Sequence, residues 1–226
     1  MARCYDQYCP VAHSLDLVGE RWSLLVIREL LKGPQRYTDL LAGLQGIGTN
    51  ILAARLRALE EGGVVRKTKL PPPAASTVYE LTPYGEELEE VVYALGRWGA
   101  RTLGPPGEGV TLAPGWLQNA LRATFEAQAA RDCEGAYELR VDGEMATITI
   151  VDGRLRVDPA AAQDADVTIE MDGATLFRLI SRELDPAAAL ADGAVRVSAD
   201  NEGGAEALET FVSLFSFAPR VPVPAS

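Results

Sequence analysis

The chain has 226 residues, 47% of them apolar, and a formal net charge of −11. This composition allows one large or two ordinary domains with apolar cores and excludes a globally disordered protein. No apolar run approaches the roughly 20 residues of a membrane span, so no membrane partner is expected. Three cysteines are too few for a disulfide scaffold, and the N-terminus lacks the layout of a signal peptide, so we expect a cytoplasmic protein.

The acidic charge is unevenly distributed along the chain. Residues 1–104 carry 12 basic and 12 acidic side chains, whereas residues 105–226 carry 9 and 20. Within the first part, residues 33–79 carry 6 basic and 3 acidic side chains. A region with little negative charge is expected where a surface approaches phosphate.

The first part of the chain is mostly helical in pattern. Short helices are predicted at 10–18, from about 21 to 32 and at 35–44, because Pro10 favours a helix start and Gly19 and Gly33-Pro34 favour helix ends. The turn "QGIG" then precedes a longer helix in "TNILAARLRALEEGGVVRK", residues 49–67.

The two faces of this longer helix differ in chemistry. Leu52, Leu56 and Leu59 fall within about 60° on a helical wheel and form its inner face. The outer face combines small side chains with hydrogen-bonding and cationic ones, which suits a helix that enters the major groove of DNA. A basic hairpin follows, with one strand in "VVRKTKL" (64–70) and a returning strand in "TVYELT".

A helix of this kind followed by a basic hairpin predicts a winged helix-turn-helix domain, with 35–44 as the supporting helix. Double-stranded DNA is therefore the expected partner. The residues expected in the groove are Thr49, Asn50, Ala53, Ala54 and Arg57, and those expected on phosphates are Arg36, Thr38, Arg55, Lys67 and Lys69.

Several motifs of this region also resemble a known family. They are a Cys-Pro start, a Trp-led second helix, a Gly-Pro-x-Arg-aromatic third helix and "RLRALE" in the groove helix, continued by "YELTPYGEELEEVVYALGRWG". Over residues 4–103 the chain resembles the HxlR-type winged-helix transcription regulators. The resemblance implies a dimeric cytoplasmic regulator that binds a two-fold-related DNA site. Some relatives are thiol-based redox sensors with a cysteine where Cys9 stands; alternatively, Cys9 is a small buried hydrophobe.

A single helix is predicted at 83–103, with an apolar stripe along one side. Since little of its own small domain remains to be covered, the stripe, together with the first helix, is expected to bury against a symmetry mate in a homodimer. The alternative is that it packs on the second domain.

The Pro- and Gly-rich segment 104–115 is predicted to be a linker, so residues 1–103 form the DNA-binding and dimerisation domain. Residues 116–218 are predicted to form a smaller sheet-plus-helices domain, which makes the chain α+β overall. Alternating stretches predict strands, including a hairpin at Asp152-Gly153, and helices are expected at 116–130, 174–192 in two pieces and 204–217. The tail, 219–226, is expected to be flexible.

The features of this second domain also resemble a family. A strand with an acidic turn, a helix, an Asp-Pro helix start, a Gly-x-hydrophobic-x-hydrophobic strand and a final amphipathic helix resemble the sterol-carrier-protein type 2 domains. The resemblance implies an apolar tunnel and a hydrophobic small-molecule effector, although apolar faces of this kind also form ordinary filled cores. The residues expected to line a pocket are Phe125, Phe177, Ile180, Leu184, Phe211, Leu214 and Phe215.

No constellation of residues indicates an enzyme. The single histidine, His13, cannot form a triad with its sequence neighbours on a helix, and no Cys or His spacing suits a zinc site or implies a cofactor. Three functions remain: a regulator that responds to an apolar ligand, a regulator that senses through Cys9, and a lipid-binding module whose winged helix serves only dimerisation.

Overall fold

The computed structural model describes residues 4–71, 75–107, 110, 112, 115–160, 165–199 and 203–217. The chain divides into two compact units, Met1–Val92 and Tyr93–Ser226. The division lies within one helix, whereas the sequence places the domain boundary after residue 103. The predicted domain limits therefore remain predictions. The predicted tail lies outside the described residues, as does part of the predicted linker.

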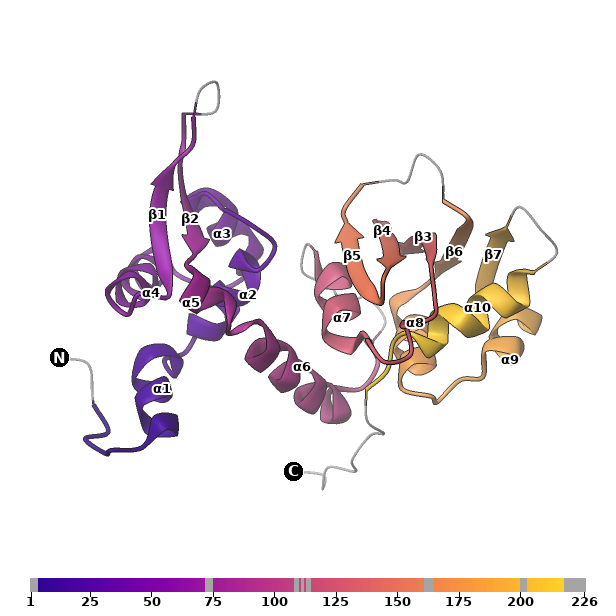
Figure 1. The fold of residues 1–226 in the computed structure, drawn as a ribbon, viewed down its shortest axis with the longest axis horizontal. Helices are drawn as coiled ribbons and strands as arrows, with labels where there is room; N and C mark the ends of the chain where they lie inside the picture. Colours follow the sequence, from indigo (N-terminus) through magenta and orange to yellow (C-terminus); the bar gives the residue numbers. More distant parts are fainter. Residues whose placement is uncertain are drawn as a thin grey trace. The chain divides into compact units, whose positions relative to one another are not determined.

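The first unit is helical with one two-stranded sheet (Figure 1). Its elements, in chain order, are α1 (Pro10–Val18), α2 (Ser23–Leu30), α3 (Tyr37–Gly43), α4 (Thr49–Glu61), β1 (Val65–Lys69), β2 (Thr77–Leu81) and α5 (Pro83–Glu86). The core lies between α2, α3, α4 and the inner end of the hairpin, where Ile27, Leu40, Leu52 and Val65 are at most 2% exposed. Apolar residues at helical spacing thus bury one face of each helix.

The hairpin β1–β2 is a wing joined to the helices by backbone hydrogen bonds. Its strands are antiparallel, with Val65 opposite Leu81 and Lys69 opposite Thr77. Gln35, just before α3, forms a bridge to Tyr79, with N–O distances of 2.9 and 2.7 Å. The start of α3 is therefore held directly against the wing.

The prediction of a single helix at 83–103 is wrong, because the chain turns between α5 and α6 (Glu89–Leu103). Thr82 caps α5, its hydroxyl accepting from Gly85 N at 3.0 Å. The amide of Leu88 then bonds to Gly85 O at 3.1 Å, a three-residue step that does not continue the α-helix. Gly85 itself packs against the Val64 carbonyl, so this turn is tied to the base of the wing.

The second unit contains a five-stranded sheet with helices gathered along it (Figure 1). Its further elements are α7 (Trp116–Thr124), β3 (Gly135–Val141), β4 (Glu144–Val151), β5 (Arg154–Asp158), β6 (Val167–Met171), α8 (Gly173–Ile180), α9 (Pro186–Ala191), β7 (Val195–Ala199) and α10 (Gly204–Ser213). The strand order is β5-β4-β3-β6-β7, with β3 and β6 parallel and all other pairs antiparallel. This mixed sheet confirms the α+β class.

Two Asp-Gly turns set the register of the sheet. Asp142-Gly143 joins β3 to β4, and Asp152-Gly153 joins β4 to β5, all four with positive φ between 48° and 82°. Turns of this shape match the twist of the strands that they connect. The hairpin predicted at Asp152-Gly153 is therefore present.

Alternate residues of the strands face the helices and form the core. Leu139, Ile148 and Ile169 are fully buried there, together with Phe211 and Phe215. The rings of Phe211 and Phe215 have centroids 4.9 Å apart, a favourable tilted arrangement.

The predicted helices at 116–130 and 204–217 are both too long. The structure ends α7 at Thr124 and α10 at Ser213, because the residues that follow pair with one another. Phe125 and Phe215 form an antiparallel bridge, flanked by Ser216 N to Thr124 O at 2.7 Å and Glu126 N to Leu214 O at 2.8 Å. Leu214 therefore reaches the core from the turn that caps α10, and Phe215 reaches it from the bridge that follows.

Candidate nucleic-acid interface

Helix α4 has one buried face and one exposed face. Leu52, Leu56 and Leu59 are at most 2% exposed and anchor the helix in the core. The side chains predicted to enter the groove all lie on its exposed face: Thr49, Asn50, Ala53, Ala54 and Arg57. Because most of them are short, a DNA backbone or base edge can approach this face closely.

The start of α4 is positioned by α3. The hydroxyl of Tyr37, the first residue of α3, donates to the carbonyl oxygen of Thr49 at 2.7 Å. Gly48 precedes α4 with an extended backbone and no side-chain cap, which leaves the first amide groups of the helix uncapped by a side chain. The two helices of the helix-turn-helix are thus linked at the end where Asn50 lies.

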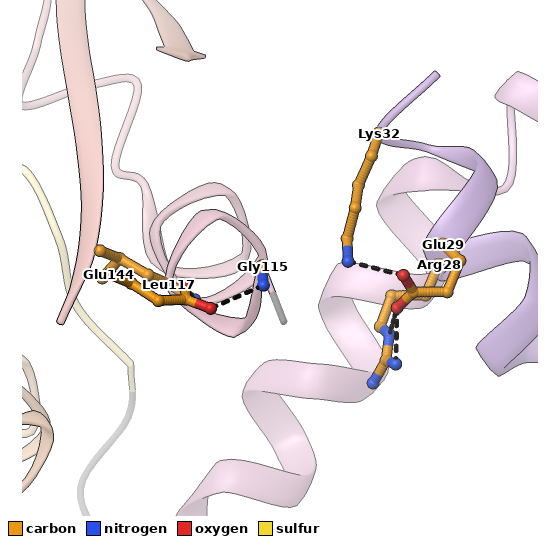
Figure 2. Close-up of polar contacts among 6 residues, drawn as sticks. All are labelled: Arg28, Glu29, Lys32, Gly115, Leu117 and Glu144. Atoms are coloured by element: carbon orange, nitrogen blue, oxygen red, sulfur yellow. Dashed lines mark hydrogen bonds and ion pairs between the residues drawn. The ribbon is translucent and has the colours of Figure 1, made fainter. Parts of the chain in front are cut away.

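The second supporting contact is a buried ionic cluster between α2 and α3 (Figure 2). Glu29 is only 5% exposed and bonds to Arg28 at 2.7 Å and to Lys32 at 2.6 Å. A Cβ added to Gly43 would lie only 2.9 Å from the Oε2 atom of Glu29. A buried carboxylate needs such partners, and the glycine lets α3 pack closely over it.

The cations of the wing divide between its two faces. Lys67 lies over the ring of Tyr79, with its Nζ atom 5.8 Å from the ring centroid. Lys67 and Lys69 share the face of β1 on which Val65 packs into the core. Arg66 lies on the other face and pairs with Glu80 at 2.8 Å. Since that partner balances the charge of Arg66, the two lysines carry the net positive charge of the wing.

The carboxylate of Glu80 is held in its charged form. Hydrogen bonds from the Thr68 hydroxyl, at 2.6 Å, and from Arg66 lower the pKa of Glu80 below its ordinary value of 4.5. Burial acts in the opposite direction and is outweighed. The Arg66–Glu80 pair therefore stays ionised at neutral pH.

Other predicted phosphate contacts differ in availability. Arg36 is exposed and its Nε donates to Ser76 Oγ at 3.2 Å, linking α3 to the wing. Thr38 is exposed beside it. Arg55 is turned toward Glu20, with 3.6 Å between charged atoms and a side chain 21% exposed, so it is less available to DNA than the sequence suggests.

Three structural features of this surface were missed by sequence reasoning. The hydrogen bond from the Tyr37 hydroxyl to the start of α4 follows from no local sequence pattern. Ser76 follows a proline-rich stretch, and nothing in the sequence indicates its contact with Arg36. Ile51 is 48% exposed on the first turn of α4, and its place beyond the leucine face on the helical wheel was the signal that could have identified it.

In the second unit, the predicted pocket residues form part of the packed core. Phe211, Leu214 and Phe215 are fully buried and Ile180 is 5% exposed, while three others are partly exposed. The partly exposed ones are Phe125, Phe177 and Leu184. The ring of Phe177 is tilted against that of Phe217, with 5.1 Å between the ring centroids.

The same unit contains a long-range helix cap (Figure 2). Glu144, at the start of β4, accepts hydrogen bonds from Gly115 N at 2.8 Å and Leu117 N at 3.4 Å. Because this carboxylate occupies the N-terminus of α7, it stabilises the helix through both its hydrogen bonds and its charge.

No helix in the described ranges is both long and apolar enough to cross a membrane. The same residues contain no group of three His, Cys, Asp or Glu side chains arranged to hold a metal ion. Cys9 occupies the N-cap position of α1 and is partly buried, and like Cys4 and Cys133 it is a free thiol.

A supporting helix, an exposed groove helix and a basic wing, in this order and tied together at their ends, define the first unit as a winged helix-turn-helix domain. The chain belongs to the HxlR-like helix-turn-helix family, whose model matches residues 17–106. The model of the SCP-2 sterol transfer family matches residues 117–211, so a sheet-plus-helix domain of that family follows.

The relatives named as regulators each match less than half of this chain. The HTH-type transcriptional regulator sll1512 of Synechocystis sp. is 39% identical over 99 residues, covering 43% of this chain and 73% of the relative. The HTH-type transcriptional regulator YodB of Bacillus subtilis is 33% identical over 91 residues, covering 40% and 81%. Among solved structures, the redox regulator HypR in its oxidised form is 28% identical, covers 40% of this chain and 94% of that one, and has a TM-score of 0.38.

Proposed function

We propose that this protein is a sequence-specific, dimeric transcription regulator of the cytoplasm, not an enzyme, whose SCP-2 domain binds a hydrophobic small molecule. The observation that carries the proposal is the exposed face of α4, where short side chains accompany Asn50 and Arg57, together with the two lysines of the wing that follows it in the chain. Asn and Arg are the side chains that bond adenine and guanine edges most effectively. Lys67 and Lys69 supply charge for the phosphate backbone.

The acidic side chains of this region support the same proposal. Asp39 accepts from the backbone amide of Arg36 at 3.2 Å, and Glu80 is engaged by Arg66. Glu60 and Glu61 lie at the opposite end of α4 from Asn50. These carboxylates thus accept a backbone hydrogen bond, pair with a cation or lie at the far end of α4 from Asn50.

Dimerisation is supported by exposed apolar side chains on two helices. On α1, Val11 is 67% exposed and Leu15 43%. On α6, Val91, Leu95 and Trp98 are between 48% and 69% exposed. Apolar stripes of this kind indicate a protein interface, and a two-fold dimer would pair two copies of α4 with two half-sites of DNA.

The test is DNA binding by the full-length protein, measured by fluorescence anisotropy across a salt series. The probes are the duplex upstream of its own coding sequence and a scrambled duplex. We expect selective binding that Arg57→Ala weakens, while Arg154→Ala, on the exposed edge strand β5, serves as the matched control. Equal and feeble binding to both duplexes would favour the lipid-binding module whose winged helix only dimerises.

The effector is proposed to be an apolar molecule that enters beside Phe125, Phe177 and Leu184, the partly exposed members of the predicted lining. Support comes from the SCP-2 family match and from the core of the second unit, which is apolar on its helix side. A fluorescent long-chain fatty acid and a fluorescent sterol are the probes. Saturable binding of either one that also changes DNA affinity is expected, and binding of neither would contradict this part of the proposal.

A second candidate is regulation through Cys9, since this thiol stands at the N-terminus of α1, where thiols are often reactive. Treatment with a mild oxidant should then change the DNA affinity of the unsubstituted protein and leave Cys9→Ser unaffected. Cys133→Ser is the control, because Cys133 lies in the other unit.

A further inference from the structure

One large aliphatic side chain on α4 has no use in the fold. Ile51 lies in the first turn of the helix and is 48% exposed, whereas the leucines of the same helix are at most 2% exposed. The core is therefore already filled from the opposite side of α4. An exposed isoleucine also gives a helix less intrinsic stability than alanine would, so helix formation does not account for it.

The neighbours of Ile51 make a narrow strip and not a broad apolar patch. One and two turns further along the helix stand Ala54 and Ala58, both exposed, which contribute only methyl groups. Arg55, also one turn away, is drawn toward Glu20. Asn50 borders the strip on its other side.

This arrangement fits a nucleic-acid edge better than a protein partner. A protein interface needs a continuous apolar area, as on α6, whereas here one aliphatic side chain stands among short and polar ones. In the major groove the apolar feature that a base edge presents is the C5-methyl group of thymine. Its position beside the hydrogen-bonding groups of the same edge matches Ile51 beside Asn50.

We infer that Ile51 packs against a thymine methyl group in each half-site and so determines a preference for thymine at that position. The inference rests on the proposed DNA-binding function and extends it to a specificity-determining residue. Burial of one methyl group corresponds to about a fourfold change in affinity, and two half-sites to about fifteenfold.

The test begins with selection of binding sites from a random pool of duplexes by the unsubstituted protein. Each thymine of the enriched site is then replaced in turn by deoxyuridine, which removes only the methyl group. We expect one position in each half-site where replacement weakens binding about fourfold. In Ile51→Ala the same replacement should have almost no effect, because the partner of the methyl group has been removed.

The control variant is Val151→Ala, which shortens an exposed aliphatic side chain of similar exposure, 52%, at the end of β4 in the other unit. It should retain the full effect of deoxyuridine. Ile51→Ala is expected to fold, since alanine favours an exposed helical position, and its melting temperature verifies this.

The outcomes distinguish a failure of the inference about Ile51 from a failure of the proposed DNA-binding function. If Ile51→Ala shows the same deoxyuridine effect as the unsubstituted protein, or if the enriched half-site has no thymine, the inference about Ile51 is wrong while the regulator remains. If the unsubstituted protein enriches no sequence, the proposed function fails and the inference fails with it.

Discussion

The wing lysines give the most quantitative prediction about DNA binding. Lys67 and Lys69 share one face of the hairpin, and Arg66 is paired with Glu80 on the other. We therefore expect Lys67→Ala/Lys69→Ala to weaken binding to all DNA sequences similarly, because these side chains are proposed to contact phosphates and not bases.

The expected magnitude follows from the number of charges removed. Each phosphate contact contributes about 0.9 to the slope of log affinity against log salt concentration. In the proposed dimer the double variant removes four contacts, which makes the slope shallower by about 3.6. Between 50 and 200 mM salt, the unsubstituted protein should therefore lose about 150-fold more affinity than the variant.

The assay is anisotropy titration of a labelled duplex at several salt concentrations. The matched control is Arg66→Met/Glu80→Gln, which removes a cation and its partner together and leaves the net charge of the wing unchanged. Its slope should equal that of the unsubstituted protein. Equal slopes for the lysine variant and the unsubstituted protein, or a control slope as shallow as that of the lysine variant, would refute the assignment of phosphate contacts to one face.

Three further predictions concern stability, measured by urea unfolding. Gly85→Ala should destabilise the protein by about 1–3 kcal/mol, because the new methyl group would overlap the Val64 carbonyl, while Gly99→Ala, with open space around it, should be neutral or stabilising; equal effects would contradict the packing argument. Glu144→Ala should cost about 1 kcal/mol through loss of the α7 cap, and Glu144→Gln less; no loss in either variant would mean that the cap contributes nothing. Burial raises the pKa of Tyr137 above its ordinary value of 10.0, so the stability that this residue contributes is full below pH 10.0 and declines as pH rises through the higher folded-state pKa; Tyr137→Phe should flatten that decline, and an unchanged curve would refute the linkage.

Much of the helix-turn-helix could be predicted because its signals are local. The leucine spacing of α4, the Pro10 start of α1 and the alternation in the wing each depend on residues within one or two turns. The exposed face that carries Asn50 and Arg57 follows directly from that spacing.

The roles of individual cations could not be predicted in the same way. In the sequence, Arg55 and Arg66 are cations in the same helix and strand as Arg57 and Lys67, and nothing local distinguishes them. In the structure, Arg55 and Arg66 each lie beside a carboxylate that is distant in sequence. Only the packing of α4 near Glu20 and the strand register opposite Glu80 identify these pairs.

The sequence by itself determined the two-domain order, the identity of most helices and strands and the chemistry of the α4 surface, because hydrophobic periodicity and turn residues act over short distances. The tertiary structure decided where α7 and α10 end, where the helix at 83–103 breaks and which charges are balanced. Those features depend on contacts between residues distant in the chain: the Phe125–Phe215 bridge, the packing of Gly85 against Val64 and the Arg66–Glu80 ion pair. At the helix ends such contacts override a helical pattern that local propensity would continue.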